Sequence, residues 1–217
     1  MLHFTDERGA AVELEPDAFT IAGYTGRDRA MVQKHIDELE REGIAPPAEV
    51  PMWYEMPPDI LTTADTIMVT SAQSCGEVEP LLVGVNGRIY LGIGSDHTAR
   101  DVEREDIATS KRVCPKPVGR TLFRIGTLDA AFDACKLESW IDGEPYQAGT
   151  FAQIAPLQTL LEGFRKRSPA PAFVLSCGTV PLLTHGFRFG KTFSAKISGG
   201  PLAAPLTLDY TIVVEST

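Results

Sequence analysis

The dipeptide Asn86-Gly87 constrains the fold of this chain more than any other feature, because it predicts a tight reversal between two apolar runs. A two-residue turn of type I′ requires positive φ at both positions, which Asn and Gly tolerate. We therefore predict a hairpin whose strands are Glu77–Val85 and Arg88–Asp96. Pro80 lies inside the first strand. Because proline cannot donate a ladder hydrogen bond, it favours an edge strand or a bulge.

The register of this hairpin places three carboxylates on one face. Counting outwards from the turn, Asp96 lies opposite Glu77, and side chains alternate between faces with a period of two. Glu79 falls on the same face, and like charges this close repel each other. Gly92 and Gly94 leave that face open, so a hard divalent cation with oxygen ligands would suit the three carboxylates. The alternative is an acidic strand face in contact with solvent.

Composition limits the class of protein. At 217 residues, 43% of them hydrophobic, the chain can bury the core of one large or two small domains. The net charge of −9 disfavours a nucleic-acid or anionic membrane partner. We find no signal-peptide pattern and no apolar run of about 18 residues, so we expect a soluble cytoplasmic protein. No C-x-x-C pair occurs, and we expect free, mostly buried thiols at Cys75, Cys114, Cys135 and Cys177.

The segment Thr25–Gly43 is the clearest predicted helix, with Thr25 or Asp28 as its cap and an apolar stripe along one face. His35 and Glu38 are three residues apart and share a face. If this helix covers the carboxylates, the pair could serve as a general base or position a water. The alternative is an ordinary charged helix surface.

Further elements follow from turn residues and periodicity. Asp142-Gly143 predicts a second hairpin, between Lys136–Ile141 and Glu144–Gln147. Lys111 comes shortly before the rigid run Cys114-Pro115-Lys116-Pro117. If it lies near the carboxylates, it could hold a substrate anion or transfer protons. The alternative is an ordinary surface lysine. The other predicted elements are strands at Ala11–Leu14, Ala18–Ala22, Thr66–Thr70, Phe173–Leu175 and Leu206–Val214, and an amphipathic helix from Ile154 to Phe164.

Two runs resemble the fumarylacetoacetate hydrolase superfamily, namely Gly76-Glu77-Val78-Glu79 and Ser95-Asp96-His97-Thr98-Ala99-Arg100-Asp101-Val102. The metal site of that family has an E-x-E followed by an aspartate in an N-D-x-[ST]-A-R-D-type stretch. The similarity covers nearly the whole chain, from about Ala22 to the end. Further matches, in the family's order, are His35-x-x-Glu38, Ser110-Lys111, Ser139-Trp140-Ile141-Asp142-Gly143 with Tyr146-Gln147, and Cys177-Gly178-Thr179.

The resemblance implies a β-rich α+β fold, a rolled mixed β-sheet or β-sandwich with a short N-terminal active-site helix and one or two further helices. It implies a single catalytic domain over residues 1–217, with a small β element at 1–22 and a helix at 25–43 that covers the site, and a homodimer. It also implies a divalent cation, with Mg²⁺ first and Mn²⁺ or Ca²⁺ as alternatives. The implied residues are the metal ligands Glu77, Glu79 and Asp96, the catalytic residues His35, Glu38 and Lys111, and the substrate contacts Thr179, Gln147, Tyr24 and Arg27.

The reaction that the resemblance implies is hydrolysis of a C–C bond, or decarboxylation, in a 2-oxo acid or β-diketo acid through a metal-stabilised enolate. A hydratase, dehydratase or isomerase of a 2-oxo or sugar-derived acid is the alternative, because the same enolate serves all of them. Glu55-Met56-Pro57 lacks the family's lysine before the proline, and Val180-Pro181-Leu182 replaces a Gly-rich loop end. These departures leave open a small-molecule-binding protein that has lost catalysis.

Overall fold

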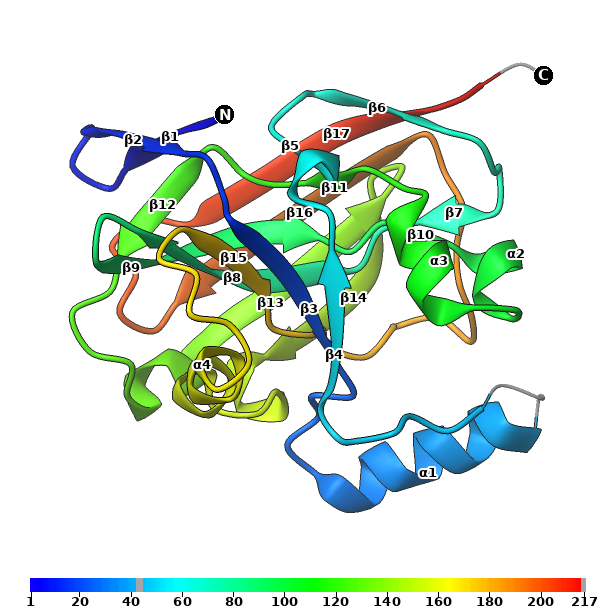
Figure 1. The fold of residues 1–217 in the computed structure, drawn as a ribbon. Coiled ribbons are helices and arrows are strands. Elements are labelled where there is room, and N and C mark those ends of the chain that lie inside the picture. Colours follow the sequence, from blue (N-terminus) through cyan, green and yellow to red (C-terminus); the bar gives the residue numbers. More distant parts are fainter. Residues whose placement is uncertain (42–44, 216–217) are drawn as a thin grey trace.

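A computed structural model of the chain describes residues 1–41 and 45–215, and its central element is the predicted hairpin (Figure 1). Its strands are β8 (Val78–Val85) and β9 (Arg88–Ser95), and they pair in the predicted register, with Glu79 opposite Gly94. Asn86 and Gly87 have φ values of 52° and 70°, as a type I′ turn requires. The hairpin prediction is confirmed.

Within the described residues, the hairpin forms the middle of an eight-stranded mixed sheet. Pro80 predicted an edge or a bulge, which is wrong, because β8 lies between β9 and β15. Proline is tolerated there because it faces Cys177, one residue past the end of β15, and uses only its carbonyl, which accepts the Cys177 N–H at 3.0 Å. The strand order is β2 (Ala11–Leu14), β1 (Leu2–Asp6), β12 (Thr121–Arg124), β9, β8, β15 (Phe173–Ser176), β3 (Ala18–Gly23) and β4 (Met52–Met56).

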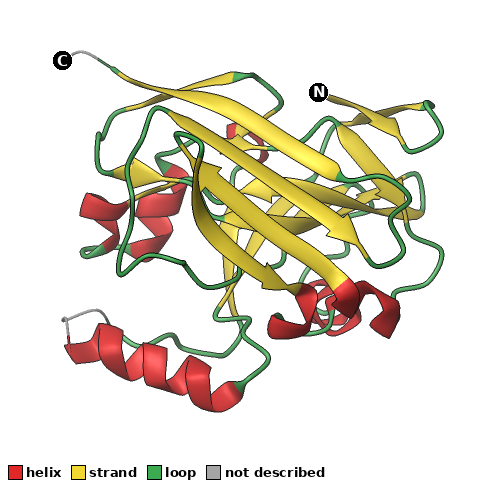
Figure 2. Ribbon diagram, turned by 180° about the vertical axis from the view of Figure 1, so that it is seen from behind, coloured by secondary structure: helices red, strands yellow, loops and turns green. Residues whose placement is uncertain are grey.

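The second predicted hairpin belongs to a sheet with five strands in the described ranges. Its strands meet at Asp142-Gly143, whose φ values are 50° and 80°. Figure 2 shows this sheet in front of the larger one. Its strand order is β14 (Glu144–Thr150), β13 (Cys135–Ile141), β16 (Thr192–Gly199), β17 (Leu206–Val214) and β6 (Thr66–Val69).

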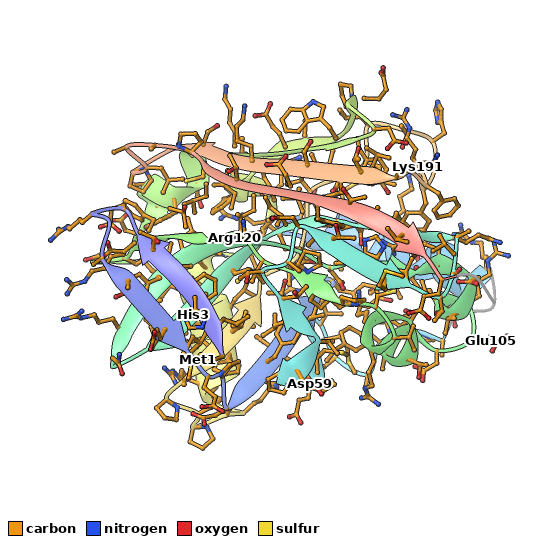
Figure 3. The ribbon with its side chains drawn as sticks, turned by 90° about the horizontal axis from the view of Figure 1, so that it is seen from above. Met1, His3, Asp59, Glu105, Arg120 and Lys191 are labelled. Carbon is orange, nitrogen blue, oxygen red and sulfur yellow. The ribbon has the colours of Figure 1, made fainter. Side chains whose placement is uncertain are left out.

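Apolar cores lie on both faces of the hairpin. Between the sheets, Leu82 and Leu91 pack with side chains of β13, β16 and β17. On the opposite face, inside the curl of the larger sheet, Leu81 and Val83 pack with side chains of β1, β2 and β3. Figure 3 shows side chains that project outwards around these layers, with Glu105 at the edge of the molecule. The hairpin is therefore buried on both sides.

The predicted open face at the two glycines of β9 is wrong. A Cβ atom at Gly94 would lie 2.8 Å from the Leu81 side chain, and one at Gly92 would lie 3.0 Å from Leu122. Leucine side chains therefore occupy the space that the glycines leave. The carboxylates are confined to the end of the hairpin where β8 begins and β9 ends.

The helices lie outside the sheets. Asp28 caps α1 (Arg29–Arg41) by accepting the N–H of Ala30 at 2.9 Å, whereas the predicted end at Gly43 lies outside the described residues. Figures 1 and 2 show α1 to one side of the sheets. No helix in the described ranges is long and apolar enough to cross a membrane. The other helices are α2 (Arg100–Glu103), α3 (Ile107–Arg112) and α4 (Leu157–Arg165), with 3₁₀ turns at Pro58–Ile60, Ala130–Ala134 and Phe151–Gln153.

Two short ladders position segments near the end of the hairpin. β10 (Thr98–Ala99) pairs with β7 (Ser74–Cys75) directly after β9. β11 (Lys116–Pro117) pairs with β5 (Leu61–Thr62). All four cysteines are free and buried, as predicted.

Candidate active site

Glu77, Glu79 and Asp96, here called the acidic cluster, lie at one end of the β8–β9 hairpin. Glu77 directly precedes β8, Glu79 lies within it and Asp96 directly follows β9. The Asp96 N–H donates to the Glu77 carbonyl at 2.9 Å, which extends the predicted register to these residues. Only 4% of Glu79 and 2% of Asp96 is exposed. Buried carboxylates this close require compensating charges or protons.

The last turn of α3 places Lys111 at Asp96. Asp106 caps this helix by accepting the N–H of Ala108 at 2.9 Å. The Lys111 ammonium group donates to Asp96 Oδ2 and lies 5.7 Å from the centre of the Tyr54 ring. Burial opposes the charge of Lys111, but the carboxylates of Asp96, Glu103 and Glu77 together outweigh burial and raise the Lys111 pKa. The structure thus brings this lysine to the acidic cluster.

Asp96 has a second lysine partner that the sequence did not predict. Lys116 is 2% exposed, its ammonium group lies 3.1 Å from Asp96 Oδ1, and it donates to the carbonyl of His97. Although burial favours the neutral acid, Lys111 and Lys116 hold the pKa of Asp96 well below its usual value. The only sequence signal was the pair of prolines beside Lys116, and a lysine in such a turn is more often exposed.

Glu79 accepts hydrogen bonds but has no cationic partner within the described ranges. Ser176 Oγ donates to Glu79 Oε2, and the Gly178 N–H donates to the same oxygen at 2.9 Å. Gly178 can do so because its φ of 91° suits glycine, and a Cβ atom there would lie 1.7 Å from Thr25 Oγ1. Burial, followed by the charge of Asp96, raises the pKa of Glu79 to about 8. At neutral pH Glu79 is therefore mostly protonated.

Arg100 neutralises Glu77. Its Nη2 lies 2.8 Å from Glu77 Oε2, although the two groups are not aligned as a hydrogen bond and Nη2 is otherwise unpartnered among the described residues. Its Nη1 donates to Glu103 Oε2 at 2.8 Å, and its Nε donates to Cys75 Sγ at 3.3 Å. The Phe187 ring lies over the guanidinium group, with its centre 3.9 Å away. Arg100 is thus a buried cation held on several sides.

His97, within the most specific sequence run, has a structural role in these contacts. Its Nδ1 lies 2.9 Å from Tyr210 Oη and its Nε2 lies 3.1 Å from Ser74 Oγ. Burial, followed by the nearby Lys116, lowers the pKa of His97 to about 3. A neutral imidazole therefore joins β17 and β7 behind Asp96.

Gln147 and Thr179 lie beside the start of β8. Gln147 Nε2 donates to Thr179 Oγ1 at 2.8 Å, and Gln147 Oε1 accepts the Val78 N–H at 2.9 Å. Thr179 Oγ1 donates to the Val78 carbonyl at 2.7 Å. Because Val78 separates the two glutamates of the cluster, the structure brings both predicted substrate contacts to the site.

The other predicted substrate contacts differ in their surroundings. Tyr24 lies near Glu103 and Lys111: burial first, then Glu103, raises its pKa, and Lys111 opposes the shift. Arg27 binds elsewhere, because its guanidinium nitrogens lie 2.7 Å from both Asp133 oxygens and Nε donates to the Ile154 carbonyl at 2.9 Å. The structure therefore brings Tyr24, and not Arg27, to the lysine.

His35 and Glu38 both belong to α1, as predicted, but their side chains lie outside the described part of the chain. Tyr54, which the sequence did not indicate, faces Lys111 from β4 and is 8% exposed. Burial is the main cause that raises the Tyr54 pKa to about 12. Tyr24, Tyr54 and Glu103 thus surround Lys111.

The acidic cluster has the donor chemistry of a divalent-cation site, since carboxylate oxygens are the ligands that hard cations prefer. Burial and then repulsion from Asp96 raise the Glu79 pKa, and that repulsion is the kind that a bound cation relieves. In the structure, however, Lys111 and Lys116 bind Asp96, and the described residues contain no group of three His, Cys, Asp or Glu side chains arranged to hold a metal ion. The residue types fit a metal, and lysines compete for its ligands.

Solved structures share this fold. A protein from Oleispira antarctica, provisionally described as a fumarylacetoacetate isomerase/hydrolase, is 18% identical with a TM-score of 0.69, over 98% of this chain and 100% of that one. The 5-carboxymethyl-2-hydroxymuconate delta-isomerase from Mycobacterium smegmatis is 17% identical with a TM-score of 0.67, over 94% and 81%. The fumarylpyruvate hydrolase from Pseudomonas aeruginosa, in complex with Mn²⁺ and pyruvate, is 14% identical with a TM-score of 0.66, over 99% and 96%.

These similarities confirm the predicted fold, that of the fumarylacetoacetate hydrolase superfamily. No curated protein matches the sequence. The model of one family, described as a protein of unknown function (DUF2848), matches residues 22–210. The chain therefore belongs to the DUF2848 family.

Proposed function

We propose that this chain is an enzyme that acts on a small 2-oxo acid or β-diketo acid through an enolate, at the acidic cluster and Lys111. The observation that carries the proposal is the buried contact of Lys111 with Asp96, next to a Glu79 whose pKa is raised to about 8. A buried ammonium group at this carboxylate can transfer protons and bind a developing anion, and the raised pKa of Glu79 marks a site that favours a bound cation.

A divalent cation is part of the proposal, with Mg²⁺ first and Mn²⁺ or Ca²⁺ as alternatives. Glu77, Glu79 and Asp96 would hold it, and when bound it would polarise the 2-oxo group of the substrate as a Lewis acid. Support comes from the cluster's own chemistry and from the similar fold of the fumarylpyruvate hydrolase described with Mn²⁺ and pyruvate.

The remaining residues have separate roles. Thr179 and Gln147, beside β8, would bind the substrate carboxylate, and Tyr24 would contact the substrate near Lys111. His35 and Glu38 of α1 would activate water or transfer protons. The proposal leaves out Arg27, because its guanidinium group is bound to Asp133.

Isomerisation is the alternative reaction. The solved structures with this fold include a hydrolase and an isomerase, and both reaction types can pass through a stabilised enolate. Product analysis separates the two, because cleavage or decarboxylation gives two products and isomerisation gives one of unchanged mass.

The test is turnover of a panel of 2-oxo and β-diketo acids by the protein loaded with Mg²⁺ or Mn²⁺. Lys111→Met should lower kcat at least about 100-fold, in the range of general acid–base catalysis. Lys136→Met, at an exposed position, is the matched control and should leave kcat unchanged. Ligand binding without turnover of any acid would instead identify a binding protein.

We also propose that the chain is a cytoplasmic homodimer. Light scattering behind size exclusion measures the mass directly, and a dimer should give twice the chain mass of 23.5 kDa. A mass of one chain at micromolar concentration would contradict the dimer without affecting the proposed chemistry.

A further inference from the structure

Lys116 is a buried cation to which the proposed chemistry gives no role. Its ammonium group contacts the same carboxylate as Lys111, but at the other oxygen: Lys111 binds Asp96 Oδ2 and Lys116 lies 3.1 Å from Oδ1. Lys116 also donates to the carbonyl of His97, the residue after Asp96. A lysine is rarely buried this completely without a specific partner.

The surroundings of Lys116 leave little room for a substrate. Lys116 is 2% exposed, and the cavity beside it, lined also by Asp96, Ser176 and core side chains that include Leu61 and Leu81, has a volume of about 10 Å³. That volume is close to what a single water needs. Lys111, in contrast, faces Tyr24, Tyr54 and Glu103. Lys116 therefore approaches Asp96 from the core and Lys111 approaches it from the side of the proposed substrate contacts.

The lysines at this end of the hairpin already offset the carboxylates without a metal. Even with Glu79 and Asp96 both ionised, their two negative charges do not exceed the two positive charges of Lys111 and Lys116, which both contact Asp96. Glu77 is paired separately with Arg100 at 2.8 Å. A divalent cation added to the cluster would leave an excess of positive charge in a buried place, which is unfavourable unless anions enter with it.

We propose that Lys116 is a positioning residue that makes metal binding at the acidic cluster depend on an anionic substrate. It holds Asp96 in place from the core side and offsets its charge, so a divalent cation and a dianionic 2-oxo acid or enolate bind tightly only together. This inference rests on the proposed function, because it requires the metal that the proposed function places on Glu77, Glu79 and Asp96.

The test measures the Kd of Mn²⁺ for the chelator-treated full chain by calorimetry, with and without oxalate, a dianion that resembles the enolate of a 2-oxo acid. The Mn²⁺–oxalate complex in free solution is subtracted. In the wild type, saturating oxalate should tighten Mn²⁺ binding at least about tenfold, within the usual range of coupling between two ligands. Equal Mn²⁺ affinity with and without oxalate overturns the proposal, and this measurement needs no variant.

The variant Lys116→Met keeps the length of the side chain and removes its charge. We expect it to bind Mn²⁺ alone about tenfold more tightly than the wild type does and to lose most of the effect of oxalate, because less positive charge remains at the cluster. Lys136→Met is the control for loss of a surface lysine and should behave as the wild type. A merely structural lysine predicts the opposite, namely weaker Mn²⁺ binding and a lower melting temperature.

The two hypotheses fail in different ways. If no form of the protein binds Mn²⁺, with or without oxalate, the metal of the proposed function is refuted and this inference with it. If Mn²⁺ binds and Lys116→Met weakens that binding, only the inference is refuted. Should Lys116→Met not fold, Lys116→Gln and the wild-type coupling decide the question.

Discussion

Replacing Glu79 with glutamine should remove a pH dependence from the stability of the metal-free protein. Burial, followed by the charge of Asp96, raises the pKa of Glu79 from 4.5 to about 8. A carboxyl group with a higher pKa in the folded than in the unfolded chain binds more protons when folded. Its contribution to stability is therefore complete below pH 4.5 and is lost as the pH rises towards 8.

The size of the effect follows from that window. Each pH unit between the unfolded and folded pKa values changes the free energy of unfolding by about 1.4 kcal/mol for one proton. Between pH 5 and pH 7.5 the wild type should thus lose about 3 kcal/mol through Glu79. Glutamine does not titrate, and its amide oxygen can still accept from Ser176 Oγ and the Gly178 N–H, which now bind Glu79 Oε2.

His97 acts in the opposite direction and must be separated. Its pKa is lowered to about 3 in the folded chain, mainly by burial, so the unfolded chain binds more protons below about 6.5 and stability rises with pH over that range. Both proteins contain His97, so its contribution cancels when Glu79→Gln is compared with the wild type at each pH.

The assay is urea unfolding followed by tryptophan fluorescence, in a chelator, at several pH values from 5 to 7.5. The stability of Glu79→Gln relative to the wild type should increase over this range by about 3 kcal/mol. Glu144→Gln, at an exposed site in the second hairpin, should show a constant difference from the wild type. A constant difference for Glu79→Gln would mean that Glu79 is already ionised in the folded protein at pH 5, and the raised pKa of Glu79 would be refuted.

Two further substitutions test the core. Gly84→Ala should lower the free energy of unfolding by about 2 kcal/mol or more in the same assay, because its Cβ atom would lie 1.9 Å from Cε1 of Phe173. The Phe173 ring cannot easily move away, since its centre lies 4.6 Å from that of the Phe164 ring. Gly126→Ala, whose Cβ atom would meet nothing within 4 Å, is the control, and an equal loss of stability in both variants would contradict this packing. His97→Gln should flatten the rise of the free energy of unfolding between pH 3 and 6.5. An unchanged slope would mean that a group other than His97 takes up the proton on unfolding.

The hairpins could be predicted because their determinants are local. Asn86-Gly87 and Asp142-Gly143 each provide two residues that accept positive φ, and both turns form as the sequence indicates. Once the first turn is fixed, the register follows by counting, and it carries Asp96 to Glu77. The acidic cluster is therefore a consequence of a turn, and a single sequence contains that information.

The surroundings of the hairpin could not be predicted in the same way. Val78–Val85 is apolar at nearly every position, which is the pattern of a strand buried on both faces, whereas we expected a face opened by Gly92 and Gly94. The helix that carries Lys111 has six residues, too few to show a helical period. Lys116 reaches Asp96 because β11 pairs with β5, and the sequence of neither strand shows which distant strand it will pair with.

Stability alone does not account for the contacts of Asp96. Burying a carboxylate with two ammonium groups removes three charges from water, and such groups contribute no more to folding than apolar side chains of the same volume, and often less. Apolar cores flank both faces of the hairpin that ends at Asp96, so apolar side chains in place of these charged ones could have extended those cores. Asp96, Lys111 and Lys116 are thus better explained by chemistry than by folding, and the lysine enclosed in the core is the residue whose removal distinguishes the two explanations.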